Sequence, residues 1–348
     1  MSIITVPESH PQPLGAGTGV TGYSAGALRR LGEAGSRGLT RRGLQVVLGV
    51  FWILDGLLQL QPYMLSRRFA TQILAPSAQG QPGWVAWPVL HSAHLVGSHP
   101  VPLDLLFAAA QLALGIGLLV RRTARLALAA SVAWAAGVWF VGEGLGGIAG
   151  GTASFLTGAP GAALLYGLLA VAAFPRTAES APGGTVEVRA LPNPIGDGQP
   201  AADWFPAVWA ALWVALGLSA LLPANRSASV VAAQLRDIGQ GVPAWLGRVD
   251  QGAASLVSHG GAASVVLLAG VPVIIGLCGL APGGWRRAAA VAGIVTALVV
   301  WVVGQSFGQL ASSSATDPNT GPLLVVAAFV LIGTVRQARD GSTSTVVA

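Results

Sequence analysis

Eight stretches of mostly apolar residues, separated by polar or glycine-rich segments, run along this 348-residue chain. A helix needs about 20 apolar residues to cross roughly 30 Å of hydrocarbon, and each stretch approaches that length. The predicted helices cover residues 43–62, 101–120, 125–143, 160–175, 204–222, 261–280, 286–304 and 321–336. The pattern therefore predicts an all-α protein, a polytopic transmembrane bundle of about eight helices.

Two of the intervening segments are long, residues 63–100 and residues 224–260. Each contains a stretch that can form an amphipathic helix with tryptophan near its start, Trp84 and Trp87 in the first and Trp245 in the second. Tryptophan is enriched in helices that lie in the membrane interface. We therefore expect each half of the chain to carry a cap on the outer side of the membrane.

The composition supports lipid as the principal partner of the chain. Hydrophobic residues make up 53% of the sequence and charged residues only 9%, with a mean hydropathy of +0.66. A soluble domain of this length does not keep such a balance in solution. The formal net charge is +6, but the arginines sit at the ends of apolar runs instead of clustering on one face, which argues against nucleic acid as a partner.

The distribution of arginine predicts the orientation. Every one of the 19 basic residues is arginine, and cytoplasmic loops are the ones enriched in basic residues. With a cytoplasmic N-terminus, only five arginines fall in outer segments: Arg67, Arg68, Arg226, Arg236 and Arg248. We therefore expect a multi-pass protein of the cell (plasma) membrane with both termini in the cytoplasm.

An internal repeat divides the predicted bundle into two halves. Residues 139–146 (WFVGEGLG) align with residues 301–308 (WVVGQSFG) at an offset of 162, and the alignment continues without a gap to Pro160 and Pro322. Upstream motifs match at offsets of 160 to 162. Four helices return the chain to its starting side, so the sequence predicts two parallel four-helix repeats.

The expected domain organisation follows from these features. It consists of a disordered cytoplasmic N-terminus (1–40), a first four-helix repeat (41–176), a cytoplasmic linker (177–203), a second four-helix repeat (204–337) and a cytoplasmic tail (338–348). The linker is rich in proline and glycine, which favours an irregular chain.

The repeat comparison also selects candidate functional residues. Polar groups needed only for the fold should recur in both halves, but Asp55 matches Leu216 and Glu143 matches Gln305. Ionisable residues within a membrane segment are costly and are functional candidates by default. The candidate polar site comprises Asp55, Gln59, Asp104, Gln111 and Glu143. The alternative is that these groups are hydrated near the interface or bond a neighbouring helix.

A weaker pattern concerns metal binding. His91 and His94 are spaced three residues apart, which places two imidazoles on one face if the segment is helical, as in zinc or copper sites. Neither a cysteine nor a nearby carboxylate accompanies them, so solvated or hydrogen-bonded histidines are the alternative.

A family resemblance begins with the stretch QLALGIGLLVRRTARLAL, residues 111–128. It is similar to the hairpin between the second and third helices of DoxX-like membrane proteins, and the chain also resembles uncharacterised actinobacterial membrane proteins. DoxX-like proteins are four-helix bundles, some of which are subunits of membrane redox systems. The resemblance implies a tandem DoxX-like architecture. It permits a quinone-linked redox role, with a quinone as cofactor and a membrane oxidoreductase as partner, and supplies no catalytic residue. The first helix departs from the family, which usually has a basic residue after its glycine, because here Gly56 is followed by Leu57 and Leu58.

Three functions remain open from the sequence. The first is a DoxX-like, quinone-associated redox subunit, and the second is a transporter for protons, a metal or a small solute. The third is a membrane scaffold without a catalytic site, and the sequence leaves open whether the protein is an enzyme.

Overall fold

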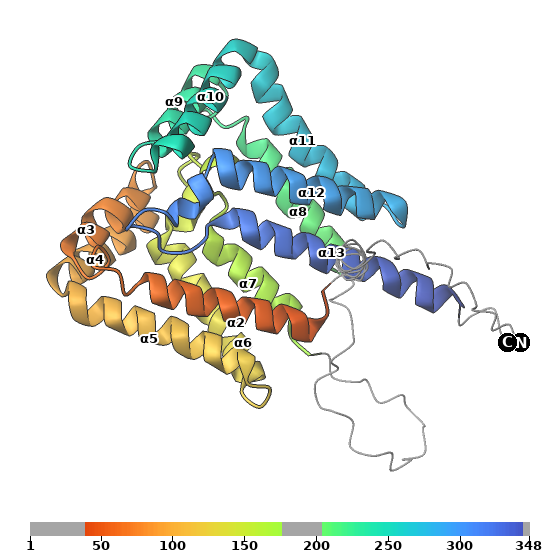
Figure 1. The fold of residues 1–348 in the computed structure, drawn as a ribbon, viewed down its shortest axis with the longest axis horizontal. Helices are drawn as coiled ribbons and strands as arrows, with labels where there is room; N and C mark the ends of the chain where they lie inside the picture. Colours follow the sequence, from red (N-terminus) through yellow and green to blue (C-terminus); the bar gives the residue numbers. More distant parts are fainter. Residues whose placement is uncertain (1–38, 176–203, 344–348) are drawn as a thin grey trace, which may run out of the picture. The chain divides into compact units, whose positions relative to one another are not determined.

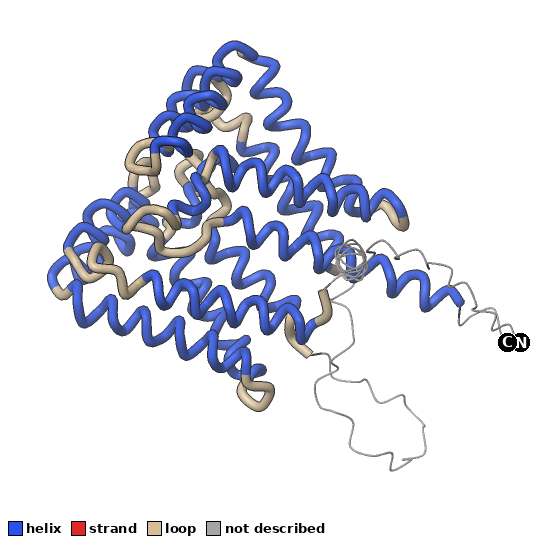
Figure 2. The backbone as a smooth tube through the Cα atoms, viewed as in Figure 1, coloured by secondary structure: helices blue, strands red, loops and turns tan. Residues whose placement is uncertain are grey.

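The computed structural model describes residues 39–175 and 204–343, and side chains up to Val335. These residues form helices and loops with no β-strand, which confirms the all-α prediction (Figures 1 and 2). Residues 1–38 of the expected disordered N-terminus, the cytoplasmic linker and residues 344–348 of the tail lie outside the described residues. The last helix continues to Thr343, six residues beyond the predicted end of the second repeat.

The first half of the described chain contains four apolar helices and a set of short ones. Its elements are α2 (Arg41–Leu58), α3 (Arg67–Phe69), η1 (Ala70–Leu74), η2 (Ala75–Ala78), α4 (Gly83–Ser98), α5 (Pro100–Leu119), α6 (Ala124–Gly137), η3 (Val138–Gly142), η4 (Gly144–Gly147), η5 (Phe155–Thr157) and α7 (Ala162–Ala172). Here η marks a short 3₁₀ or π turn. The predicted cap segment corresponds to α3, η1, η2 and α4.

The second half follows the same order. Its elements are α8 (Phe205–Ser219), α9 (Ala228–Ile238), α10 (Ala244–Gly260), α11 (Ala262–Leu280), α12 (Gly284–Val303), η6 (Ser306–Gln309) and α13 (Thr320–Thr343). Each of the eight predicted apolar segments therefore forms a helix, with ends shifted by a few residues. Here α9 and α10 stand in the place that α3 and α4 take in the first half (Figure 1).

Four helices in the described part are long and apolar enough to cross a membrane: Pro100–Leu119, Ala124–Gly142, Ala262–Leu280 and Gly284–Val303. Three other apolar helices are shorter, Ala162–Ala172, Phe205–Ser219 and Thr320–Val335. At 1.5 Å per residue the 11 residues of α7 rise about 16 Å, roughly half the thickness of the hydrocarbon core. The four long helices fit a membrane protein, whereas the length of α7 does not by itself provide a full span.

The closest helix pairs rest on small residues. Gly115 of α5 faces the backbone of α2, where a Cβ would lie 2.6 Å from the Gly49 carbonyl oxygen. Gly276 of α11 faces α8, where a Cβ would lie 2.9 Å from the Ala210 carbonyl oxygen. Small residues let helix backbones approach closely in membrane proteins. The pairs α2–α5 and α8–α11 thus pack through the same device.

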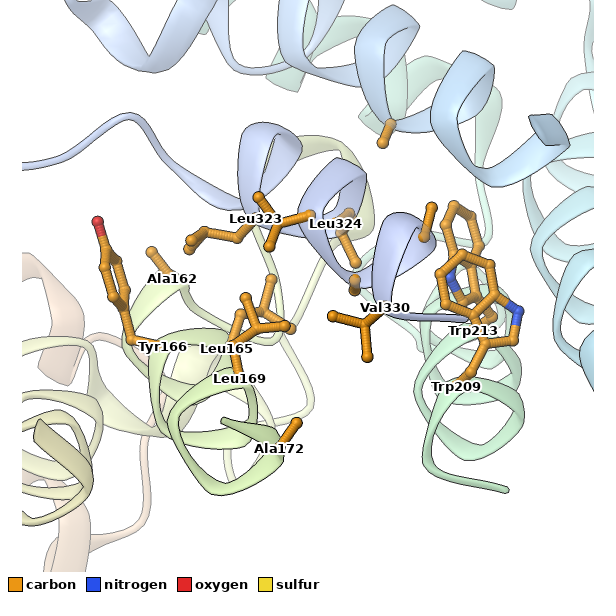
Figure 3. Packing of buried hydrophobic residues seen from close by; sticks show 14 of the residues in the cluster. Ala162, Leu165, Tyr166, Leu169, Ala172, Trp209, Trp213, Leu323, Leu324 and Val330 are labelled. Carbon is orange, nitrogen blue, oxygen red and sulfur yellow. The ribbon is translucent and has the colours of Figure 1, made fainter. Parts of the chain in front are cut away.

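The main apolar core joins the two halves. It is built largely from α7, α8 and α13, with Leu169, Trp209, Trp213, Leu323 and Val330 all at most 1% exposed. Figure 3 shows these side chains meeting between the three helices. Apolar packing among α7, α8 and α13 therefore holds the two halves together.

Candidate functional site

A cavity of about 410 Å³ lies in the first half, between the last turn of α2, the short turns η1 and η2, and the start of α7. Glu143, at the end of η3, and Asp317, in the segment that leads into α13, also line it. The cavity therefore brings together groups that are far apart in sequence. It receives three carboxyl groups, one each from Asp55, Glu143 and Asp317.

Asp55 lies in the last turn of α2 and is only 2% exposed. Its Oδ1 atom has no hydrogen-bond partner. Gln59 follows one turn later, is 5% exposed, and leaves its Oε1 atom without a partner. Because side chains four residues apart share a helix face, both groups point to the same cavity. An unpartnered buried acceptor is costly and calls for an explanation.

Two aromatic rings form one wall beside Asp55. The rings of Trp52 and Tyr166 have centroids 4.3 Å apart with planes tilted by 33°. The indole Nε1 of Trp52 donates to Ser131 Oγ at 2.7 Å, which fixes that ring. The Tyr166 hydroxyl lies beside the Asp55 carboxyl group, within hydrogen-bonding reach of it. In Figure 3 this hydroxyl points away from the apolar core. Both residues line the cavity, so this wall consists of two apolar rings and one polar group, the Tyr166 hydroxyl.

The two carboxyl oxygens of Glu143 have different surroundings. Oε1 accepts a hydrogen bond from the backbone N–H of Ala163 at 3.0 Å, at the start of α7. A carboxylate at a helix N-terminus is favoured by the unsatisfied N–H groups there. Oε2 has no partner. One oxygen therefore caps a helix, and the other is buried against Gly161 in the cavity wall.

The loop after Glu143 folds back over the cavity. Gly146 has a φ of +60°, and a Cβ there would collide with the Pro160 carbonyl oxygen. The same carbonyl accepts the indole N–H of Trp139 at 2.7 Å. Glycine is needed at this turn because it tolerates both the left-handed backbone and the close approach. The turn holds Glu143 against the N-terminus of α7.

Asp317 reaches the cavity from the second half. Its Oδ1 accepts the backbone N–H of Asn319 and its Oδ2 accepts the Thr316 hydroxyl, both at 2.7 Å. Burial raises the pKa of Asp317 above its ordinary value, and these two hydrogen bonds offset part of that rise. The carboxyl groups of Asp55, Glu143 and Asp317 are near enough for their charges to interact.

Two further glutamine side chains extend the polar wall. Gln111 of α5 is 7% exposed and its Oε1 has no partner. Gln81 donates from Nε2 to the Gly144 carbonyl oxygen at 2.9 Å, which leaves its Oε1 unpartnered. Both line the cavity. Among the residues that the structure describes, no arginine or histidine lines it, so its charged groups are all acidic.

The other predicted site residues lie elsewhere. Asp104 is fully buried in α5 and both of its oxygens lack partners, but it does not line this cavity. His91 and His94 lie on α4 with exposed side chains, and His91 stacks on Trp87 at a centroid distance of 5.2 Å. No group of three or more metal-ligating side chains occurs in the described part of the chain. The structure therefore brings together Asp55, Gln59, Gln111 and Glu143 but not Asp104.

The matching place in the second half is uncharged. Gln305 stands where the first half has Glu143: its Oε1 accepts the backbone N–H of Gly321 at 3.1 Å, and its Nε2 donates to Thr320 Oγ1 at 2.7 Å. Asp250, the buried acid of this half, accepts the Ser306 hydroxyl at 2.6 Å. Burial raises the pKa of Asp250, and that hydrogen bond opposes the rise.

One part of the predicted repeat alignment needs correction. The indole N–H of Trp301 donates to the Pro318 carbonyl oxygen at 2.8 Å, as Trp139 does to Pro160. Pro318, and not Pro322, therefore takes the place of Pro160. The second half is four residues shorter between its tryptophan motif and its last helix, so the alignment without a gap is wrong after residue 308.

Sequence reasoning missed Asp317, Tyr166 and Trp52 as members of the site. Tyr166 is the one tyrosine in an otherwise apolar segment, a signal that the sequence offers. Asp317 has no such signal, because its contribution depends on the second half approaching the first. Comparison of the chain with protein-family models, with curated proteins and with solved structures finds no match.

Proposed function

We propose that the chain is a polytopic protein of the cell membrane, built from two parallel four-helix repeats, that binds a small cation in the acidic cavity and carries it across the membrane. The composition of the cavity wall is the observation that supports cation binding. Three carboxyl groups and several unpartnered acceptors line it, and no basic residue of the described chain neutralises them. A cationic ligand would supply the missing countercharge and hydrogen bonds.

Matched contacts support the two-repeat architecture. Gly56 of α2 approaches the Ala108 carbonyl of α5, and Gly217 of α8 approaches the Ala269 carbonyl of α11, all at an offset of 161. The Leu118 carbonyl at the end of α5 accepts from Arg42, and its counterpart at Gly279 accepts from Arg286. Matched carbonyl groups at the C-terminal ends of α5 and α11 thus each accept a hydrogen bond from an arginine, although the arginines come from different helices.

The proposed topology places α4 and α10 on the outer side and both termini in the cytoplasm. Ser98 is the last residue of α4, and Ser258, at an offset of 160, lies in the last turn of α10; both are exposed. In a Cys278→Ala background, Ser98→Cys and Ser258→Cys should both react with a membrane-impermeant maleimide added outside intact cells. Labelling of one from outside and of the other only after lysis would contradict the parallel repeats.

A closed apolar layer beyond the cavity supports transport by alternating access. Below Asp55, the side chains of Leu44, Leu48 and Leu169 are at most 1% exposed and belong to the main core. The cavity is thus closed toward the end of the bundle where α2 begins. Transporters keep a binding site open to one side at a time, and the repeats supply the two bodies whose relative motion opens the other side.

The test uses the purified full-length chain in proteoliposomes. Concentration jumps of sodium, guanidinium, methylammonium and tetramethylammonium chloride are applied while the transported charge is recorded. At least one cation should give a current that Asp55→Asn abolishes. Asp104→Asn is the matched control, because Asp104 is equally buried but does not line the cavity. Absence of current for every cation, or equal currents in wild type and Asp55→Asn, would contradict the proposal.

A quinone-linked role of DoxX type is a second proposal. The aromatic wall of Trp52, Tyr166 and Phe69 favours it, because a quinone ring can stack on such a surface. The acidic cavity opposes it, because a reduced quinone carries developing negative charge. Organic extraction of the purified protein distinguishes the two, since a redox subunit should retain quinone in near-stoichiometric amount.

A further inference from the structure

The unpartnered groups of the cavity are all of one kind. Each buried side-chain atom in its wall that lacks a partner, the Tyr166 hydroxyl beside Asp55 apart, is an acceptor oxygen: Asp55 Oδ1, Gln59 Oε1, Gln81 Oε1, Gln111 Oε1 and Glu143 Oε2. None is an N–H group. A ligand that satisfies this wall must therefore bring several hydrogen-bond donors as well as positive charge.

The geometry argues against a bare metal ion. The described residues contain no group of three or more carboxylate, imidazole or thiolate side chains close enough to ligate one ion. The cavity of about 410 Å³ is also far larger than a single coordinated cation, and lies within the range of small-molecule sites. Its acceptors are spread around a volume instead of converging on one point.

The aromatic wall fits an organic cation. Trp52 and Tyr166 lie beside Asp55, and a cation held against an aromatic face gains from the ring quadrupole. Guanidinium groups combine several N–H donors with a flat face that stacks on aromatic rings, and primary ammonium groups carry three donors. Quaternary ammonium groups share the charge and the aromatic preference but have no N–H donor.

We infer that the cavity selects small organic cations that carry several N–H donors, guanidinium or primary ammonium compounds, over quaternary ammonium and alkali-metal ions. This inference rests on the proposed cation-binding function. Charge selection comes from Asp55, Glu143 and Asp317, and donor selection comes from the neutral acceptors Gln59 and Gln111.

The test measures binding to the purified full-length protein in detergent by isothermal titration calorimetry. The probes are guanidinium, methylammonium, tetramethylammonium and sodium chloride. Guanidinium and methylammonium should bind at least about tenfold more tightly than tetramethylammonium, because they can donate several hydrogen bonds to the wall and tetramethylammonium can donate none. Sodium should give no saturable heat. Equal affinity for tetramethylammonium would overturn the inference but leave cation binding intact, and no binding of any probe would overturn both.

Two variants assign the selectivity to the cavity. Gln111→Leu removes a neutral acceptor and no charge, so guanidinium binding should weaken about tenfold while tetramethylammonium binding stays within about twofold. Glu143→Gln keeps the helix-capping oxygen, as Gln305 does in the second half, and should weaken both organic cations. Unchanged guanidinium binding in both variants would place the ligand outside this cavity and overturn the inference.

Discussion

The two halves of the described chain make several matching contacts, but they differ in the polar groups at matched positions. In each half, a tryptophan indole N–H near the end of the third long helix donates to a proline carbonyl in the loop before the last helix. The pairs are Trp139 with Pro160 and Trp301 with Pro318. The first half then places Asp55, Glu143 and Gln111 around a cavity, where the second half has Leu216, Gln305 and Pro272. The helix packing therefore does not require those three polar side chains, because the second half is built without them.

The helix-packing glycines should show the largest effects, and equal ones in both halves. Gly115→Ala and Gly276→Ala each place a methyl group against a backbone carbonyl of the neighbouring helix. Overpacking of this kind costs about 3 kcal/mol or more where the backbones must separate. Both variants should lower the melting temperature in detergent strongly, measured by a thermal-shift assay.

The matched controls for these glycines are Gly137→Ala in α6 and Gly270→Ala in α11. A Cβ at either position meets nothing within 4 Å. These two variants should be neutral or slightly stabilising, since alanine has the higher helix propensity. A large loss in only one of Gly115→Ala and Gly276→Ala would break the structural equivalence of the halves.

The second largest effect should come from exchanging the groups at the matched capping position. Gln305→Glu puts a carboxyl at a site that is 3% exposed, and removes the amide N–H that now bonds Thr320. We expect a loss of about 2 kcal/mol in the free energy of unfolding. Glu143→Gln should be neutral or stabilising, because its capping oxygen is kept. Chemical denaturation measures the free energy of unfolding of both variants. Equal losses in the two variants would show that the capping positions of the two halves tolerate an exchange of glutamate and glutamine equally.

The helices of the fold were predictable because the apolar segments carry their own signal. All eight predicted segments form helices in the structure, since a long apolar run with few charges specifies a helix in lipid. It was less predictable which of these helices are long and apolar enough to cross a membrane. The helix α2 contains Arg41, Arg42 and Asp55, and α7 is only 11 residues long. Helix lengths depend on where turns such as Gly144–Gly147 begin, and local sequence specifies those poorly.

The candidate site was predictable only in the part that lies within one half. Asp55 and Gln59 share a helix face, and the repeat comparison singled out Glu143 and Gln111, so residue spacing was enough to group them. Asp104 was grouped with them because it is acidic and near a helix end. It shares a face of α5 with Gln111 but lies seven residues earlier, about 10 Å along the helix, and so does not line the cavity. Asp317 enters through a contact between halves, which neither periodicity nor the repeat reports.

Asp55→Leu tests the comparison directly, because Leu216 occupies that place in the second half. Removing an unpartnered carboxyl from a 2% exposed position should leave the melting temperature unchanged or raise it by a few degrees, while cation binding is lost. The measurement pairs a thermal-shift assay with calorimetry on the same preparation. A clear fall in melting temperature would instead mean that Asp55 holds α2 against its neighbours, and would remove the main support for the site.

The smallest expected effect concerns Asp317 and is a dependence on pH. Its pKa is raised in the folded protein by burial, so the protonated form is the one that folding favours. That stabilisation is complete below the ordinary pKa of an aspartate in the unfolded chain, and is lost as the pH rises through the folded-state pKa. Asp317→Asn imitates the neutral form and retains an oxygen for the Asn319 N–H. The variant should therefore melt slightly higher than wild type at pH 7, and the gap should close toward pH 4. A gap that stays constant over this range would show that the carboxyl group of Asp317 does not titrate in the folded state, and that it contributes to the cavity only as a hydrogen-bond acceptor.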